Sequence, residues 1–309
     1  MHPRRSLGAM ASPVTDLPVP STLSPSKITA FTNCPLAFRF SVVERLPEPP
    51  SPAALKGTLV HRALELLFSE YPRGSRSRVA AQQALDTAWR ELAGGEELGC
   101  LGLDAAEEAA YLVDARVLVD RYLELEDPDA VNAVGLELNL STDLAGITVR
   151  GIIDRLDELE DGSLAVVDYK TGRAPRTEQS RSRLSGVQMY ALMCEAELGR
   201  RPSVVRLLYL RDRIVISAAP TDQAMRGTRQ RALGVWSAIE RACRECDFRP
   251  NPSSLCRFCA YQAYCPSFGG DPTLAASELG TAEIAAVPLT KPGSPALEAA
   301  TLGAESLSA

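Results

Sequence analysis

A carboxylate and an amine lie two residues apart at the end of a short apolar run, "AVVDYKTGRA", residues 165–174. In an extended chain alternate side chains share a face, so Asp168 and Lys170 point the same way as Val166. Burying an acid at the end of a hydrophobic strand is costly unless a partner, a metal or a substrate compensates. This pattern is typical of a site for metal or acid–base chemistry.

A second acid ends the preceding apolar run. Alternating apolar residues run from Ile147 to Ile153, Asp154 follows, and the turn residues Asp161-Gly162 separate this run from the next one. Hairpin pairing predicts that Asp154 approaches Asp168, where the two carboxylates repel each other unless a cation lies between them. Carboxylate oxygens suit Mg²⁺ or Mn²⁺, which can activate water and neutralise charge on a phosphate. The residues predict a metal site for phosphodiester hydrolysis, and an ordinary ion pair with Lys170 is the alternative.

The elements that must position these residues alternate between helical and strand periodicity. With 45% hydrophobic residues, the 309-residue chain can bury a substantial core. The patterns predict an α/β fold, with a small mixed sheet flanked by helices. Helices are expected over 25–33, 57–70, 78–93, 105–126, 184–198 and 221–244, and strands over 134–140, 147–154, 164–170 and 203–212.

Charge and hydropathy narrow the classes of protein. The net charge of −6 argues against a protein that coats polyanions, although arginines cluster between Arg173 and Arg213 and leave room for a local basic groove. The sequence has neither a membrane-length apolar run nor the apolar core of a secretion signal. We therefore expect a cytoplasmic protein that does not associate with membranes.

The stretch "GIIDRLDELEDGSLAVVDYKTG", residues 151–172, resembles RecB-type nucleases of the PD-(D/E)XK superfamily, and "GTLVHRALE", residues 57–65, resembles an upstream helix of that family. The resemblance implies a restriction-endonuclease-like core that binds Mg²⁺ or Mn²⁺. The implied metal ligands are His61, Asp154, Asp168 and the carbonyl of Tyr169, and Lys170 is the implied catalytic lysine. An acid is also common on the strand before the hairpin, which makes Glu137 a candidate for a supporting role.

The family usually carries a Q-x-x-x-Y helix after the lysine motif. Aligning this helix on Tyr190 puts Gly186 where the glutamine belongs, and Gln188 is displaced by two positions. The predicted DNA contacts are therefore Tyr190, Gln188 and Arg173, with an ordinary place in the helix as the alternative for the first two.

The spacing of the cysteines is the second pattern that indicates a metal. The segment "LCRFCAYQAYCP" contains Cys256-x2-Cys259-x5-Cys265, and short loops let such thiolates converge on one centre. Members of the same superfamily, including AddB-type and CRISPR-associated nucleases, combine this spacing with one distant upstream cysteine. The resemblance implies a [4Fe–4S] cluster held by these three residues and Cys34, which would join the two ends of the domain.

A zinc site is the alternative use of the thiols. Two C-x2-C pairs lie close together in the chain and could hold Zn²⁺, although this arrangement leaves Cys34 and Cys265 unused. The zinc set would be Cys243, Cys246, Cys256 and Cys259.

Together these patterns predict one nuclease domain over residues 23–268, with its core at about 130–215 and a cysteine-rich end at 243–268. Residues 1–22 and 269–309 read as disordered tails. The expected function is a metal-dependent DNA exonuclease for single strands in repair or recombination. Because no Walker A motif is present, a separate helicase would supply the strand. Two alternatives are a non-catalytic nucleic-acid-binding module with a zinc or iron–sulfur scaffold, and an α/β domain with an ordinary ion pair and structural zinc.

Overall fold

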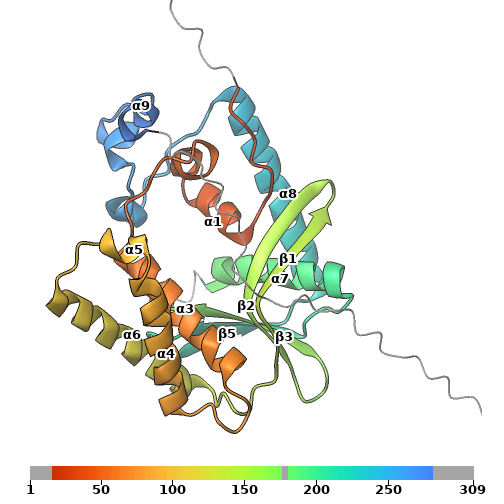
Figure 1. Ribbon diagram of the computed structural model, residues 1–309. Helices are drawn as coiled ribbons and strands as arrows, with labels where there is room; N and C mark the ends of the chain where they lie inside the picture. Colours follow the sequence, from red (N-terminus) through yellow and green to blue (C-terminus); the bar gives the residue numbers. More distant parts are fainter. Residues whose placement is uncertain (1–15, 176–179, 281–309) are drawn as a thin grey trace, which may run out of the picture.

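The computed structural model describes residues 16–175 and 180–280 (Figure 1). In the described part, five strands form one sheet in the order β1-β2-β3-β4-β5. Neighbouring strands are antiparallel except β3 and β4, which are parallel and are joined by the crossover helix α7, Ser180–Leu198. The strands are β1 (Ala133–Leu144), β2 (Ile147–Glu158), β3 (Leu164–Lys170), β4 (Val204–Tyr209) and β5 (Ile214–Ala218).

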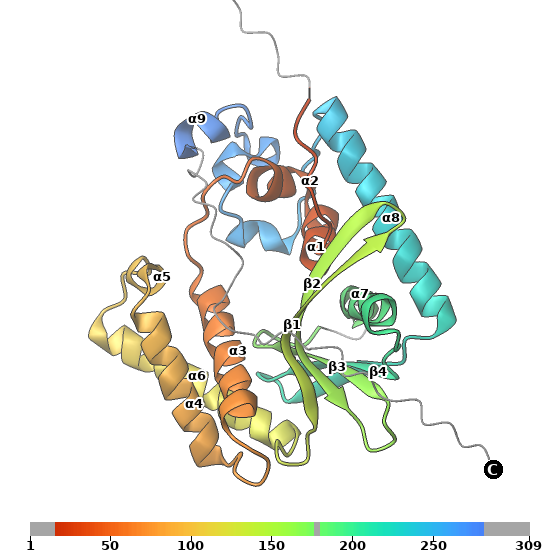
Figure 2. The same cartoon turned by 45° about the vertical axis from the view of Figure 1, so that its right-hand side comes forward.

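Helices cover both faces of this sheet (Figure 2). One face packs against α3 (Pro52–Glu70), with α4 (Arg78–Ala93) and α6 (Ala105–Leu125) behind it. The other face packs against α7, with α8 (Asp222–Glu245) and α1 (Pro25–Asn33). Side chains of β3 serve both cores in alternation, since Val166 belongs to the α7 side and Val167 to the α3 side. The mixed α/β fold predicted from the sequence is confirmed.

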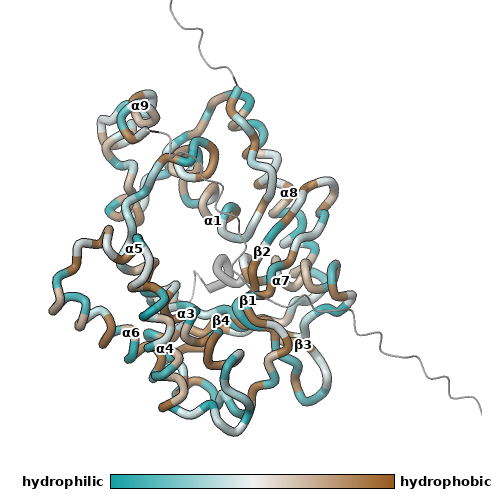
Figure 3. The backbone as a smooth tube through the Cα atoms, in the orientation of Figure 1, coloured by the Kyte–Doolittle hydropathy of each residue, from teal (hydrophilic) through white to brown (hydrophobic). Residues whose placement is uncertain are grey.

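The inner strands carry the hydrophobic residues that this two-sided packing requires. Hydrophobic positions follow one another along β3 and β4, whose side chains are mostly buried (Figure 3). Strands that are covered on both faces have near-continuous apolar runs for this reason.

Shorter elements complete the described chain. They are α2 (Pro35–Phe38), a π-helical turn (Arg39–Val43), α5 (Glu96–Gly99), three 3₁₀ turns (Ser254–Phe258, Gln262–Tyr264 and Pro266–Phe268) and α9 (Ala275–Leu279). No helix of the described ranges is both long and apolar enough to cross a membrane.

Local capping explains where the helices begin. Ser24 accepts a 3.1 Å hydrogen bond from the Lys27 backbone N–H, which caps α1 as its sequence predicts. The same device starts α3 at Pro52, earlier than the expected residue 57, because Ser51 accepts a hydrogen bond from the backbone of Ala54.

The expected tails need correction at their inner ends. The Leu17 backbone N–H donates a 3.1 Å hydrogen bond to the carbonyl of Cys243, and Ala275 of α9 is fully buried in the main core. Residues 16–22 and 269–280 therefore belong to the folded domain. Composition misses them because isolated leucines and small alanines can be buried without an apolar run. The rest of both expected tails, 1–15 and 281–309, lies outside the described residues.

Candidate metal centre

The candidate site lies where β2 and β3 diverge. Their antiparallel ladder ends at the pair Arg155 and Val167. Beyond this pair, the Asp154 carboxylate accepts a 2.7 Å hydrogen bond from the Tyr169 backbone N–H. The edge of β2 that β3 leaves is paired instead with Leu23, which forms an isolated parallel bridge. Asp154 thus links two strands at the point where they separate.

Glu137 on β1 lies across from Asp154. Its φ of +44° is left-handed, which is uncommon for a residue with a side chain. The normal alternation breaks at this residue, because Leu138 packs on the α7 side whereas Leu136 packs on the α3 side. Backbone strain of this kind costs about 1–3 kcal/mol and clusters at functional sites. The bend turns the Glu137 carboxylate into the same small region as Asp154.

His61 approaches these acids from α3. Its Nδ1 lies 3.4 Å from Asp154 Oδ1, and its Nε2–H donates a 3.1 Å hydrogen bond to the Tyr169 carbonyl. One ligand atom from each of His61, Glu137 and Asp154 lies within 4.8 Å of the others, and we call these three residues the metal-centre group. An imidazole nitrogen and two carboxylates are a donor set that fits Mg²⁺ or Mn²⁺.

The charges around His61 favour its protonated form while no cation is bound. Burial opposes protonation, but the hydrogen bond to Asp154 and the negative charges of Asp154 and Asp168 together raise the pKa of His61 above 6.5. A metal ion must displace this proton before the imidazole can bind it.

Asp168 and Lys170 form an ion pair beside the metal-centre group. Asp168 is only 5% exposed, and burial raises the pKa of its carboxyl to about 6 although Lys170 opposes the shift. Burial acts against the charge on Lys170, but the Asp168 carboxylate outweighs it and raises the lysine pKa. Asp168 lies outside the group of three, although its charge still acts on His61 and Asp154.

Tyr190 of α7 lies over β2 and near the acids. Burial raises the pKa of its hydroxyl, and the charges of Asp168, Asp154 and Glu137 raise it further. Its position depends on Gly151, because a Cβ at that residue would lie 2.7 Å from Tyr190 Cε1. The first glycine of the motif therefore makes room for the tyrosine.

The two other predicted DNA contacts lie elsewhere. Gln188 accepts a 3.3 Å hydrogen bond from the Thr228 hydroxyl of α8, so this side chain joins two helices. Arg173 is exposed just beyond β3. A role in DNA binding stays a prediction for both residues.

A buried arginine network below the site was missed by the sequence reasoning. Arg155 is 0% exposed and donates hydrogen bonds of 2.7 and 2.9 Å to the two carboxylate oxygens of Asp157. It also donates to the hydroxyls of Tyr169 at 2.7 Å and Tyr122 at 3.1 Å. The motif letters "DRLD" contain a signal, since Arg155 and Asp157 alternate along one strand. The network holds Tyr169, whose carbonyl faces His61.

The cysteine-rich end packs against the N-terminal helices. The Tyr261 hydroxyl donates a 2.9 Å hydrogen bond to the Leu46 carbonyl, and the Asn251 amide donates one of 3.0 Å to the carbonyl of Asn33. Burial raises the pKa of the Cys259 thiol, and three neighbouring thiols raise it further. Those neighbours are Cys34, Cys256 and Cys265.

The predicted zinc set is arranged differently. Cys243 interacts with Cys246 and with the carbonyl of Pro18. Thiolates around one tetrahedral Zn²⁺ lie about 3.8 Å apart. Within residues 16–175 and 180–280, His61, Glu137 and Asp154 are the only group of three or more metal-ligating side chains whose ligand atoms lie within 4.8 Å of one another. The thiol positions thus fit a larger four-thiol cofactor better than mononuclear zinc.

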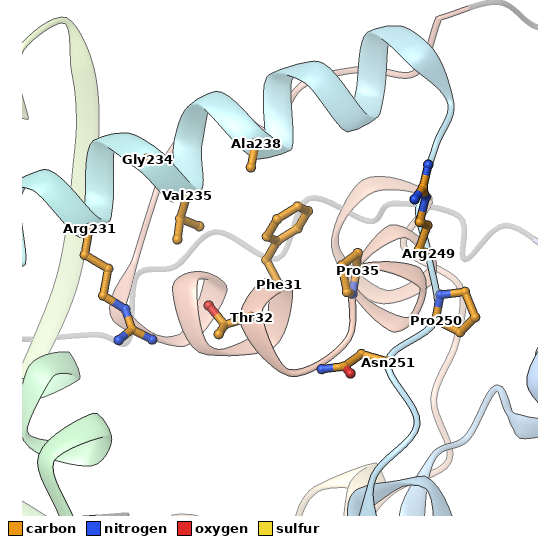
Figure 4. A pocket seen from close by; sticks show the side chains of 10 residues that line it. All are labelled: Phe31, Thr32, Pro35, Arg231, Gly234, Val235, Ala238, Arg249, Pro250 and Asn251. Carbon is orange, nitrogen blue, oxygen red and sulfur yellow. The ribbon is translucent and has the colours of Figure 1, made fainter.

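A groove of about 510 Å³ lies away from the acids, between α1 and α8. Phe31 and Pro35 form its α1 side, and Arg231 and Arg249 come from the facing segments (Figure 4). None of the metal-centre residues lines it. The candidate chemistry therefore belongs to the fork between the strands.

Comparison with known proteins identifies the class. Residues 22–266 match the family model of the PD-(D/E)XK nuclease superfamily, so the chain belongs to this superfamily and carries its nuclease domain. The resemblance inferred from the motifs is confirmed, as is the expectation of a nuclease enzyme.

Curated relatives share only part of their length with this chain. One of the two subunits of an ATP-dependent helicase/deoxyribonuclease from Streptococcus equi subsp. zooepidemicus is 28% identical over 164 residues, which are 49% of this chain and 14% of the relative. The protein of the same name from Streptococcus mutans serotype c is 28% identical over 161 residues, covering 50% and 14%. A solved structure from Eubacterium rectale, named provisionally as an exonuclease, has a TM-score of 0.49 at 11% identity and covers 78% of this chain and 88% of its own. The family assignment depends on the family model alone.

Proposed function

We propose that the protein is a Mg²⁺- or Mn²⁺-dependent deoxyribonuclease that removes nucleotides from single-stranded DNA ends. The observation that carries this proposal is the meeting of His61, Glu137 and Asp154 beside the Asp168–Lys170 ion pair. The family membership supports nuclease chemistry, and the deoxyribonuclease relatives support DNA as the substrate.

Each residue has a separate role in the proposed reaction. His61, Glu137 and Asp154 would hold the cation, with Asp168 and the Tyr169 carbonyl as further ligands, and the bound cation would activate water and neutralise charge on the phosphate. Lys170 keeps its proton because Asp168 raises its pKa, so it acts as a hydrogen-bond donor to the attacking water or to a phosphate oxygen. Asp168 holds the ammonium in place. Tyr190 borders the site from α7, where it would contact the DNA strand.

An assay on end-labelled single-stranded DNA, with Mg²⁺ or Mn²⁺ and with EDTA, tests the proposal. Lys170→Ala and Asp168→Asn should each lower cleavage by at least about a hundredfold, the usual effect of removing a group that stabilises the transition state. Arg200→Gln is the matched control, because Arg200 pairs with Glu158 at the opposite end of the sheet. Full cleavage by Lys170→Ala would show that the mechanism is wrong. Labels at either end, and double-stranded substrates, would show the strand preference and polarity.

We also propose that Cys34, Cys256, Cys259 and Cys265 hold a [4Fe–4S] cluster. Four thiols near one another, contributed by the two ends of the domain, support it. The cluster would act as a structural link between α1 and the C-terminal turns. Anaerobic purification should yield a brown protein with about four iron and four sulfide per chain, and Cys259→Ser should lose both whereas Cys100→Ser should retain them. A colourless wild-type protein containing zinc would contradict the cluster.

The relatives named as parts of a helicase/deoxyribonuclease support a separate helicase as the supplier of single strands in DNA repair. Co-purification of this chain with an ATP-dependent helicase, and faster cleavage of duplex DNA when both are present with ATP, would test this partnership. Unchanged duplex cleavage with the co-purified helicase would contradict it.

A further inference from the structure

Three basic side chains from separate parts of the chain meet beside β2. Lys27 of α1 donates hydrogen bonds of 2.8 and 3.0 Å to the carbonyl and hydroxyl of Thr22. The next residue, Leu23, is bonded to β2, since its carbonyl accepts a 2.8 Å hydrogen bond from the Arg150 backbone N–H. These contacts fix the Lys27 ammonium next to Arg150. Arg45, which follows the π-helical turn, completes what we call the basic triad: Lys27, Arg45 and Arg150.

The positive charges of the triad act on one another. Burial lowers the pKa of Lys27, and the neighbouring charges of Arg45 and Arg150 lower it further. Arg45 and Arg150 are exposed, and Lys27 is half-buried. In the ranges 16–175 and 180–280, no ion pair joins any of the three to an acid, whereas most arginines near an acid here form such pairs, as Arg201 does with Glu195. Converging cations without an acidic partner suit a polyanion.

The triad lies on the same row of side chains as a metal-centre acid. Along β2, Val149 and Ile153 are buried on the α7 side, so Arg150, Ile152 and Asp154 point to the opposite face. Ile152 is 44% exposed and lies across from the exposed Asn139 of β1. Both views place α1 beside this part of the β1–β2 hairpin (Figures 1 and 2).

The spacing along this row suits a nucleic-acid strand. Four residues of a β-strand span about 13 Å, which equals about four nucleotides of a stacked strand at ~3.4 Å each and fewer of an extended one. A strand that reaches Asp154 can therefore place an upstream or downstream phosphate at Arg150, with the exposed Ile152 side chain beneath the nucleotides between them.

We propose that the basic triad is a phosphate-binding subsite for the single strand whose end is cleaved at the metal-centre group; this inference rests on the proposed nuclease function. The triad binds backbone phosphates and reads no base, so binding is independent of sequence. It holds the strand along the exposed face of β2, and its distance from the metal-centre group sets the shortest substrate that benefits from it.

Binding is measured in EDTA, where no cleavage occurs, by fluorescence anisotropy of a labelled oligothymidylate longer than the ~16 nucleotides that a single-strand site spans. Arg150→Gln and Arg45→Gln should each weaken binding about tenfold. Each should also reduce the slope of log K against log salt by about 0.7, the effect of one lost phosphate contact on a single strand. Arg200→Gln removes the same charge at the far end of the sheet and should change neither quantity. Thermal unfolding of each variant verifies that it is folded.

Cleavage separates the failure of this inference from failure of the proposed function. With Mg²⁺ or Mn²⁺, Arg150→Gln should cleave a dinucleotide as fast as the wild type but show a raised KM for the long oligonucleotide. If triad variants bind and cleave long DNA like Arg200→Gln, the triad is not a subsite, whatever the enzyme does. If the wild type binds DNA through the triad but cleaves nothing with any divalent metal, the proposed function is wrong and the subsite stands.

Discussion

Replacement of Arg155 tests the buried network below the candidate site. Arg155 and Asp157 are 0% and 3% exposed, and the arginine also pairs with Glu126. Arg155→Met keeps much of the side-chain volume but leaves the Asp157 carboxylate buried without its cation. Removing one partner of a buried ion pair typically costs about 3–5 kcal/mol. Since whole domains are stable by about 5–15 kcal/mol, this single change should remove a large share of the free energy of unfolding.

The pH dependence of this loss follows from Asp157. Burial already raises the pKa of its carboxyl above 3.8 although Arg155 opposes the shift, and removal of the arginine raises it further. The folded variant therefore binds a proton that the unfolded chain releases, so its stability decreases as pH rises through this interval. The deficit relative to wild type should be largest near pH 8 and smaller near pH 5.

Urea unfolding followed by circular dichroism measures the deficit at both pH values. Adding Asp157→Asn to Arg155→Met removes the unpaired charge and should recover at least about half of the lost stability, because the largest part of the penalty is the buried carboxylate. A deficit below about 1 kcal/mol at pH 8, or a double variant no more stable than Arg155→Met, would refute this reasoning.

Three further predictions concern the candidate site. Gly151→Ala should destabilise the protein by about 1–3 kcal/mol in urea unfolding, because its Cβ would lie 2.7 Å from Tyr190 Cε1. Gly227→Ala in α8, where a Cβ meets nothing within 4 Å, should instead be neutral or stabilising; equal effects of both would contradict the steric argument. Glu137→Asn should leave the melting temperature of the metal-free protein unchanged or raised, since asparagine tolerates left-handed backbone, while the rise that Mn²⁺ produces shrinks; an undiminished rise would remove Glu137 from the site. Finally, Mn²⁺ affinity measured by calorimetry should decrease as pH falls through the raised pKa of His61, because the protonated imidazole cannot bind a metal. His61→Gln should flatten this pH profile, and a flat profile in the wild type would contradict the role of the imidazole.

The parts of the fold with strong local signals were predictable from the sequence. β3 begins and ends at Leu164 and Lys170, as its alternating pattern and the preceding turn predict. Ser24 and Pro25 start α1 in the same way. In contrast, β5 was missed, because this short edge strand exposes Ile214 and has no clear buried face.

Features that depend on distant partners were not predictable. The left-handed backbone of Glu137 opposes its local preference, so only the surrounding β1–β2 hairpin can impose it. The motif placed Asp154 and Asp168 in one region, but it contains no information that Glu137 is the acid that joins His61 and Asp154. Similarly, the partners of Arg155 include Tyr122 and Glu126 of a preceding helical segment, far away in the sequence.

A crystal of the wild-type protein soaked in Mn²⁺ would test the central claim most directly, because manganese is located by its anomalous scattering. The account predicts a peak bounded by the imidazole of His61 and the carboxylates of Glu137 and Asp154, within ligand distance of each. A fully occupied manganese site elsewhere on the protein, with no peak among these three side chains, would contradict it.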